Sequence, residues 1–148
     1  MPDQTPEQAP RLDHVGLNVA NLDAAAAWYG AAFGYRRELE LHLESLDLHI
    51  VMLISSTRQH RLELLHRPGS RPGLRAANPA EAVLTEGFGH LAFEVHGVDA
   101  AVDRLVALGA SVVMTPRSSP EPGVRMAFVT DPEGNLIEVL DRSSPARA

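Results

Sequence analysis

Two histidines and two glutamates stand at matching places in the two halves of the chain. His14 and His90 are 76 residues apart, and Glu63 and Glu138 are 75 residues apart. Each glutamate is the one carboxylate inside an apolar segment, where an unpaired charge is costly to bury. Imidazole nitrogens and carboxylate oxygens together suit divalent Zn, Ni, Co, Mn or Fe. We therefore predict that the four side chains hold one such metal ion and leave two positions of an octahedral ion for water or substrate.

The matching positions arise from an internal repeat. LDHVGLNVANLDAAAAWYGAAFG at 12–34 is similar to GHLAFEVHGVDAAVDRLVALG at 89–109, and each predicts a strand, a polar turn and a helix ending at glycine. HRLELLHR at 60–67 is similar to NLIEVLDR at 135–142, and both predict strands. Further strands are expected at 36–43, 48–54, 111–115 and 124–130.

The repeat predicts an α+β fold of two βαβββ modules in tandem, which form a cupped mixed sheet with the helices on its outer face. The predicted parts are a disordered tail at 1–10, a first module at 11–66, a linker at 67–87, a second module at 88–142 and a tail at 143–148. The linker is rich in proline and glycine, and we expect at most one helical turn in it, near 80–84.

Side-chain alternation places the four candidate ligands on the concave face. Val15 and Leu17 must pack under the helix, so His14 faces the other way, and the same parity applies to the other three. A single histidine or glutamate there is more often a hydrogen-bonded structural group than a ligand. The matched set of four favours the metal site. We expect the remaining histidines, at 42, 49, 60, 66 and 96, at the surface or the rim.

Three further polar residues, Asn18, Arg61 and Glu94, are candidates for substrate binding on the concave face. They could equally be structural groups at the rim. Arg61 in particular could pair with Glu94 or with another acid.

Composition excludes several classes of function. The 148 residues contain no cysteine and no lysine, which rules out disulfides, thiolate metal sites and Schiff-base chemistry. The net charge of −6 argues against nucleic acid and anionic membranes as partners. Because the N-terminal segment is polar and proline-rich, we expect no signal peptide and a cytoplasmic location.

Four segments, LDHVGLNVANLDAAAAWYGAAFGY, RLELL, GFGHLAFEV and RMAFVTDPEGNLIEVLD, resemble the vicinal oxygen chelate superfamily. It includes glyoxalase I, methylmalonyl-CoA epimerase, extradiol dioxygenases, and the fosfomycin and bleomycin resistance proteins. The resemblance covers residues 11–142 and implies paired βαβββ modules around a metal. The ligand pattern is similar to that of glyoxalase I and the epimerase, and it falls on His14, Glu63, His90 and Glu138. Dioxygenases and fosfomycin-modifying members lack the acid at Glu63.

This resemblance implies a metal-dependent lyase or isomerase, either lactoylglutathione lyase-like or methylmalonyl-CoA epimerase-like. Such an enzyme moves a proton alpha to a carbonyl through a metal-bound enediolate, with Glu138, or alternatively Glu63, as the base. We find no counterpart of the glutathione-binding arginines and asparagines, and only Arg71 and Arg75 could meet a coenzyme A phosphate.

Two other functions stay open at this point. One is a resistance-type protein that sequesters a small drug or toxin in the same cup, and the other is an Fe(II) dioxygenase. In every case the partner is a small molecule. The resemblance also implies a homodimer, with the site inside one chain or shared between two.

Overall fold

The computed structural model describes residues 9–143, so the predicted tails at 1–10 and 143–148 lie mostly outside the described residues. The chain divides into two compact units, residues 1–70 and 71–148. Each unit contains one four-stranded mixed sheet.

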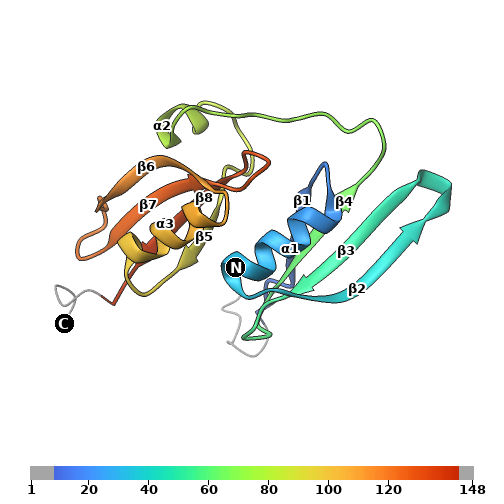
Figure 1. Ribbon diagram of the computed structural model, residues 1–148, viewed down its shortest axis with the longest axis horizontal. Helices are drawn as coiled ribbons and strands as arrows, with labels where there is room; N and C mark the ends of the chain where they lie inside the picture. The colour runs from blue at the N-terminus through green and yellow to red at the C-terminus, as the bar shows by residue number, and fades with distance from the viewer. Residues whose placement is uncertain (1–8, 144–148) are drawn as a thin grey trace. The chain divides into compact units, whose positions relative to one another are not determined.

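The first unit is a βαβββ module (Figure 1). Its elements are β1 (His14–Asn18), α1 (Leu22–Phe33), β2 (Arg36–Leu43), the 3-10 turn η1 (Glu44–Leu46), β3 (Leu48–Ile54) and β4 (Arg61–His66). The strand order is β1-β4-β3-β2, with β1 parallel to β4 and the other neighbours antiparallel. The β2–β3 hairpin extends beyond α1 as a long ribbon, drawn in cyan and green.

The second unit repeats this topology. It begins with the short helix α2 (Pro79–Ala82) and continues with β5 (Leu91–Glu94), α3 (Val98–Ala107), β6 (Ser111–Ser118), β7 (Arg125–Thr130) and β8 (Leu136–Asp141). The strand order is β5-β8-β7-β6, again with one parallel pair, β5 and β8. The predicted α+β fold with two βαβββ modules is therefore confirmed. Strand β6 extends past the expected residue 115, and β5 begins one residue after His90.

Strand alternation divides each sheet into a buried face and an open face. On β4, Leu62 and Leu64 are fully buried beneath α1, and on β8 Ile137 and Val139 are fully buried beneath α3. The residues between them therefore point to the other face of the sheet. This parity puts a glutamate on the open face of each unit.

The helices begin and end at defined caps. The side-chain oxygen of Asn21 accepts a hydrogen bond from the backbone N–H of Ala24 at 3.0 Å and caps α1. Gly34 ends this helix in the left-handed conformation, with φ of 74°. Gly97 begins α3 without a capping side chain of its own, and the carboxylate of Asp141 accepts its N–H at 2.8 Å. No helix within residues 9–143 is long and apolar enough to cross a membrane.

Replacing Asn21 by alanine removes the cap of α1. We expect Asn21→Ala to lower the free energy of unfolding by about 1 kcal/mol. Asn21→Asp keeps a capping oxygen and should stay close to wild type. Urea unfolding followed by the fluorescence of Trp28, the one tryptophan, which lies on α1, measures both. Equal stability of the alanine variant and wild type would contradict the cap.

The bond between Asp141 and α3 predicts a pH dependence of stability. Hydrogen bonds from the Ser143 side chain and from the Gly97 N–H lower the pKa of Asp141 from 3.8 to about 2. Because the folded pKa is depressed, the stabilisation is complete above about pH 4 and is lost as the pH falls toward 2. We expect wild type to be more stable than Asp141→Asn at pH 6, with the difference shrinking between pH 4 and 2 in urea titrations. A difference that stays constant over this range would contradict the assignment.

Candidate functional site

In the first unit, His14 and Glu63 come together on the open face of the sheet. The parallel register of β1 and β4 pairs Gly16 with Glu63. His14 is two residues before Gly16 on β1 and therefore lies on the same face of the sheet. Nε2 of His14 lies 3.7 Å from Oε2 of Glu63. A Cβ atom on Gly16 would lie 3.9 Å from Oε1 of Glu63 and 3.4 Å from Cδ1 of Leu65. These are ordinary van der Waals distances, so an alanine would fit beside the carboxylate, and glycine leaves that space empty.

Asp13 orients the His14 ring. Its Oδ2 accepts a hydrogen bond from Nδ1 of His14 at 2.7 Å, and this bond lowers the pKa of Asp13. Since an ionised carboxylate only accepts, Nδ1 carries the proton of this hydrogen bond, and Nε2 is the ring nitrogen that faces Glu63. Carboxylates that fix histidine ligands in this way are common around metal sites. This role of Asp13 was not predicted from the sequence, although an acid next to His14 is a signal for it.

The second unit holds the equivalent pair, His90 and Glu138. Nε2 of His90 lies 3.2 Å from Oε2 of Glu138. The imidazole packs edge-on against Phe128, with ring centroids 5.2 Å apart. Ala92 pairs with Glu138 in the β5–β8 register, in the place that Gly16 occupies in the first unit. Gly89 stands where the first unit has Asp13, so the repeat does not duplicate the carboxylate that orients the histidine.

Both glutamates are mostly buried beside apolar neighbours. The side chains of Glu63 and Glu138 are 22% and 18% exposed. Met52 flanks Glu63 on β3, and Phe128 flanks Glu138 on β7. A carboxylate in such surroundings is destabilising unless a cation or hydrogen bonds compensate it.

The donor atoms fit a divalent cation. Each pair brings an imidazole nitrogen and a carboxylate oxygen to 3.2–3.7 Å, close to the separation of about 3.0–3.4 Å between neighbouring ligands of one metal ion. Each unit thus contributes one nitrogen and one oxygen on the open face of its sheet. The grouping of all four around one ion stays a prediction.

Arg61, one of the predicted substrate-binding residues, belongs to an ion-pair network. Its Nε donates to Glu38 at 2.6 Å and its Nη1 to Asp13 at 3.3 Å. The Arg61 guanidinium lowers the pKa of Glu38. Through Asp13 the network reaches His14, so Arg61 supports the orientation of this ring. From the sequence, Arg61 could bind substrate, pair with Glu94 or pair with another acid. In the structure its partners are Glu38 and Asp13.

Asn18 and Glu94, the other two predicted substrate-binding residues, are exposed. They end β1 and β5 on the faces that carry His14 and His90. Their contribution to substrate binding stays a prediction.

Three arginines come together around Asp13, the neighbour of His14, and the sequence did not indicate this grouping. Arg11, Arg58 and Arg61 line one open hollow in the first unit, together with Leu12, Asp13 and Gln59. Arg11 and Arg58 are far apart in the sequence, and the return of the chain into β4 brings them together. Arg61 in this hollow is paired with Asp13 and Glu38, so Arg11 and Arg58 are the cations that it offers to a ligand.

Comparison with known proteins identifies the fold and the family. The family model described as Glyoxalase/Bleomycin resistance protein/Dioxygenase superfamily matches residues 11–139. An ethylmalonyl-CoA/methylmalonyl-CoA epimerase from Cereibacter sphaeroides is 33% identical over 106 residues, which cover 70% of this chain and 74% of the relative. A probable lactoylglutathione lyase from Synechocystis is 27% identical, over 90% of this chain and 96% of the relative.

A solved structure agrees with this assignment. The crystal structure of a glyoxalase family protein from Bacillus cereus superimposes with a TM-score of 0.73 at 23% identity and covers 94% of this chain and 98% of its own. At this identity the likeness concerns the fold alone. The family match over most of the chain, together with the duplicated βαβββ topology, shows that this protein belongs to the glyoxalase/bleomycin resistance/dioxygenase superfamily.

Proposed function

We propose that this protein is a metal-dependent enzyme that moves a proton at a carbon next to a carbonyl group. His14, Glu63, His90 and Glu138 would hold one divalent metal ion, and Glu138 would accept the proton. The observation that carries the proposal is the duplication of one histidine–glutamate pair, at 3.7 Å in the first unit and 3.2 Å in the second. Each pair combines a nitrogen donor and an oxygen donor at a spacing that ligands of one ion can have.

The bound metal would supply Lewis acidity that polarises the carbonyl oxygen of the substrate and makes the neighbouring C–H more acidic. Glu138 would take that proton while its counterpart Glu63 stays on the metal; its carboxylate is mostly buried against Phe128, with the small Ala92 on its other side. The substrate carbon can therefore approach Glu138 over Ala92. Return of the proton to the opposite side of the same carbon gives epimerisation, and return to the neighbouring carbon gives isomerisation.

The first unit offers a surface for the rest of the substrate. Leu39 and Leu41, on β2, are 49% and 47% exposed, and they pair with Met52 and Ile50 on the face that carries Glu63. This apolar strip suits an alkyl or acyl group, and the arginine hollow around Asp13 suits a carboxylate or phosphate. We favour a 2-substituted acyl-CoA over a glutathione adduct, since the epimerase relative has the higher identity, 33% against 27%.

Exchange of the substrate proton with solvent tests this function. The protein is loaded with Co, Ni, Zn or Mn and incubated in D₂O with a single epimer of methylmalonyl-CoA or with a 2-oxoaldehyde–thiol adduct. We expect NMR to show deuterium at the alpha carbon. Tight binding without exchange would indicate a sequestering protein, and consumption of O₂ with Fe(II) alone would indicate a dioxygenase; either result would overturn the proposal.

Glu138→Gln distinguishes the base from the other glutamate. The amide keeps a ligand oxygen but cannot accept the proton, so we expect deuterium exchange to fall by about 10²–10⁴-fold while one metal ion per site remains. Glu63→Gln should retain much more activity. Elemental analysis beside the exchange assay gives both readouts. Full exchange by Glu138→Gln with metal bound would assign the proton transfer to another residue.

Asp13→Asn tests the residue that positions His14. Loss of the charged acceptor should weaken the hydrogen bond to Nδ1 and lower metal affinity by about 10–100-fold. Asp23→Asn is the matched control, because Asp23 is an exposed acid of the same unit that pairs with Arg37. Competition with a chromophoric chelator measures both affinities. An unchanged affinity in Asp13→Asn would show that this carboxylate has no part in metal binding.

A further inference from the structure

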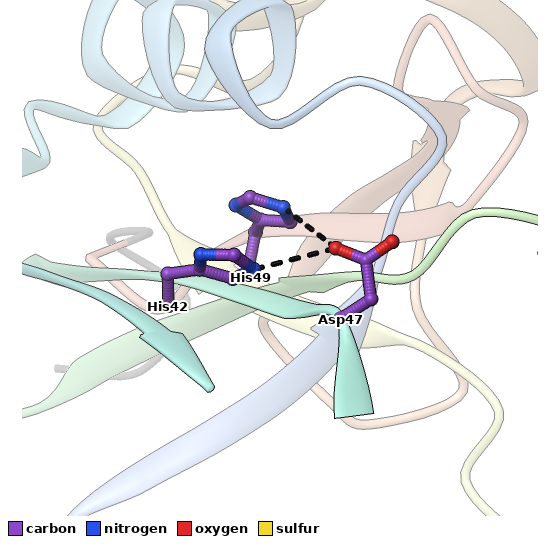
Figure 2. Close-up of side chains that lie close together, drawn as sticks. All are labelled: His42, Asp47 and His49. Atoms are coloured by element: carbon purple, nitrogen blue, oxygen red, sulfur yellow. Dashed lines mark hydrogen bonds and ion pairs between the residues drawn. The ribbon is translucent and has the colours of Figure 1, made fainter. Parts of the chain in front are cut away.

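The tip of the β2–β3 hairpin gathers three side chains that the proposed reaction does not use. His42 is near the end of β2, Asp47 follows the turn η1, and His49 is near the start of β3. Figure 2 shows both imidazole rings and the carboxylate pointing toward one another. Among the described residues, they are the group of histidines and acids whose ligand atoms all lie within 4.8 Å of one another.

The hairpin fixes this arrangement through its register. His42 and His49 are directly opposite each other on the antiparallel strands, so their side chains leave the same face side by side. The rings stack with centroids 4.0 Å apart and planes 8° apart. Asp47 has a φ of 47°, a left-handed conformation that aspartate tolerates, and its N–H donates to the carbonyl of Glu44. This turn directs the carboxylate back over the two rings.

The distances match those within a metal site. Nε2 of His42 and Nε2 of His49 lie 3.3 and 3.4 Å from the same oxygen, Oδ1 of Asp47. Ligands bound tetrahedrally to zinc at about 2.0–2.1 Å lie about 3.3–3.5 Å from one another. Because the stacked rings are nearly parallel, their nitrogen lone pairs also run nearly parallel. The rings must turn out of the stack for both lone pairs to meet one ion, and rotation about the side-chain torsions of these exposed residues allows it. The side chains are 44–60% exposed, so an ion can enter.

We propose that the hairpin tip binds a zinc-class divalent ion through Nε2 of His42, Oδ1 of Asp47 and Nε2 of His49. Two imidazoles and one carboxylate favour Zn²⁺ and its first-row neighbours over Mg²⁺ and Ca²⁺, which prefer oxygen ligands alone. Three protein ligands leave the fourth position of a tetrahedral ion to water or to an external ligand.

This site is separate from the site proposed for catalysis. His49 pairs with His66, whereas Met52 pairs with Glu63, three residues further along β3 and β4. Because three residues are an odd number of steps along a strand, His49 and Glu63 project from opposite faces of the sheet. The hairpin site therefore lies on the other face of the first unit, and loss of one site should leave the other intact.

Zinc titration of the chelator-treated full chain tests the proposal. The background is His14→Ala/His90→Ala, which removes two ligands of the site proposed for catalysis. We expect this background to bind about one zinc ion per chain in calorimetry. Adding His42→Ala or Asp47→Asn should weaken that binding at least about tenfold, whereas adding His96→Ala, an exposed histidine of the other unit, should not. Asparagine tolerates the left-handed backbone at position 47, so Asp47→Asn should keep the turn.

Imidazole NMR provides a second readout that does not depend on stoichiometry. Zinc should move the ring resonances of His42 and His49 and leave those of His96 in place, and magnesium should move none of them. A background that binds no zinc, or binding that His42→Ala leaves unchanged, would overturn the hairpin site. Failure of the catalytic metal site gives another result. In that case, zinc binding by the otherwise wild-type chain would be lost with His42→Ala and unaffected by His14→Ala.

Discussion

The main constraint on this structure is the free energy that is needed to place a charged carboxylate within an apolar strand. Glu63 and Glu138 lie between leucine, isoleucine and valine side chains that form the cores of their units. Alternation along the strand moves each carboxylate to the open face but leaves it only 22% and 18% exposed. A small residue, Gly16 or Ala92, lies beside each carboxylate on the neighbouring parallel strand. The facing histidine then gives each carboxylate a partner that can share a cation with it.

Periodicity and repetition made most of the fold predictable. The strands at 36–43 and 48–54, and the burial of Leu62 and Leu64 beneath α1, depend on local alternation, which a sequence carries directly. The end of β6 was less predictable. Pro116 lies inside this strand, which has irregular pairing with β7 between Met114 and Arg117, and a proline ordinarily suggests that a strand has ended.

The candidate ligands were predictable for the same reason, since a repeat reveals equivalent residues without any knowledge of their contacts. The roles of the residues around these ligands were not predictable, because they depend on contacts between segments that are distant in the sequence. Arg61 on β4 pairs with Glu38 on β2. Arg11 and Arg58, which are distant in the sequence, line the same hollow. The stacking of His42 on His49 follows from the register of the hairpin, and periodicity alone places both residues only at the surface.

Departures from the repeat distinguish the two metal-binding proposals. The histidine–glutamate pair is present in both units, which argues that it dates from the duplication itself. The hairpin cluster is not repeated, because the residue of the second unit that corresponds to His49 is Arg125, which pairs with Ser118. Asp13, whose counterpart is Gly89, likewise occurs in the first unit alone. The two units thus share the residues that the proposed metal ion would require. The first unit adds groups that orient one ligand and that can bind a second ion on the opposite face of its sheet, where parity along the strands keeps the two sites independent.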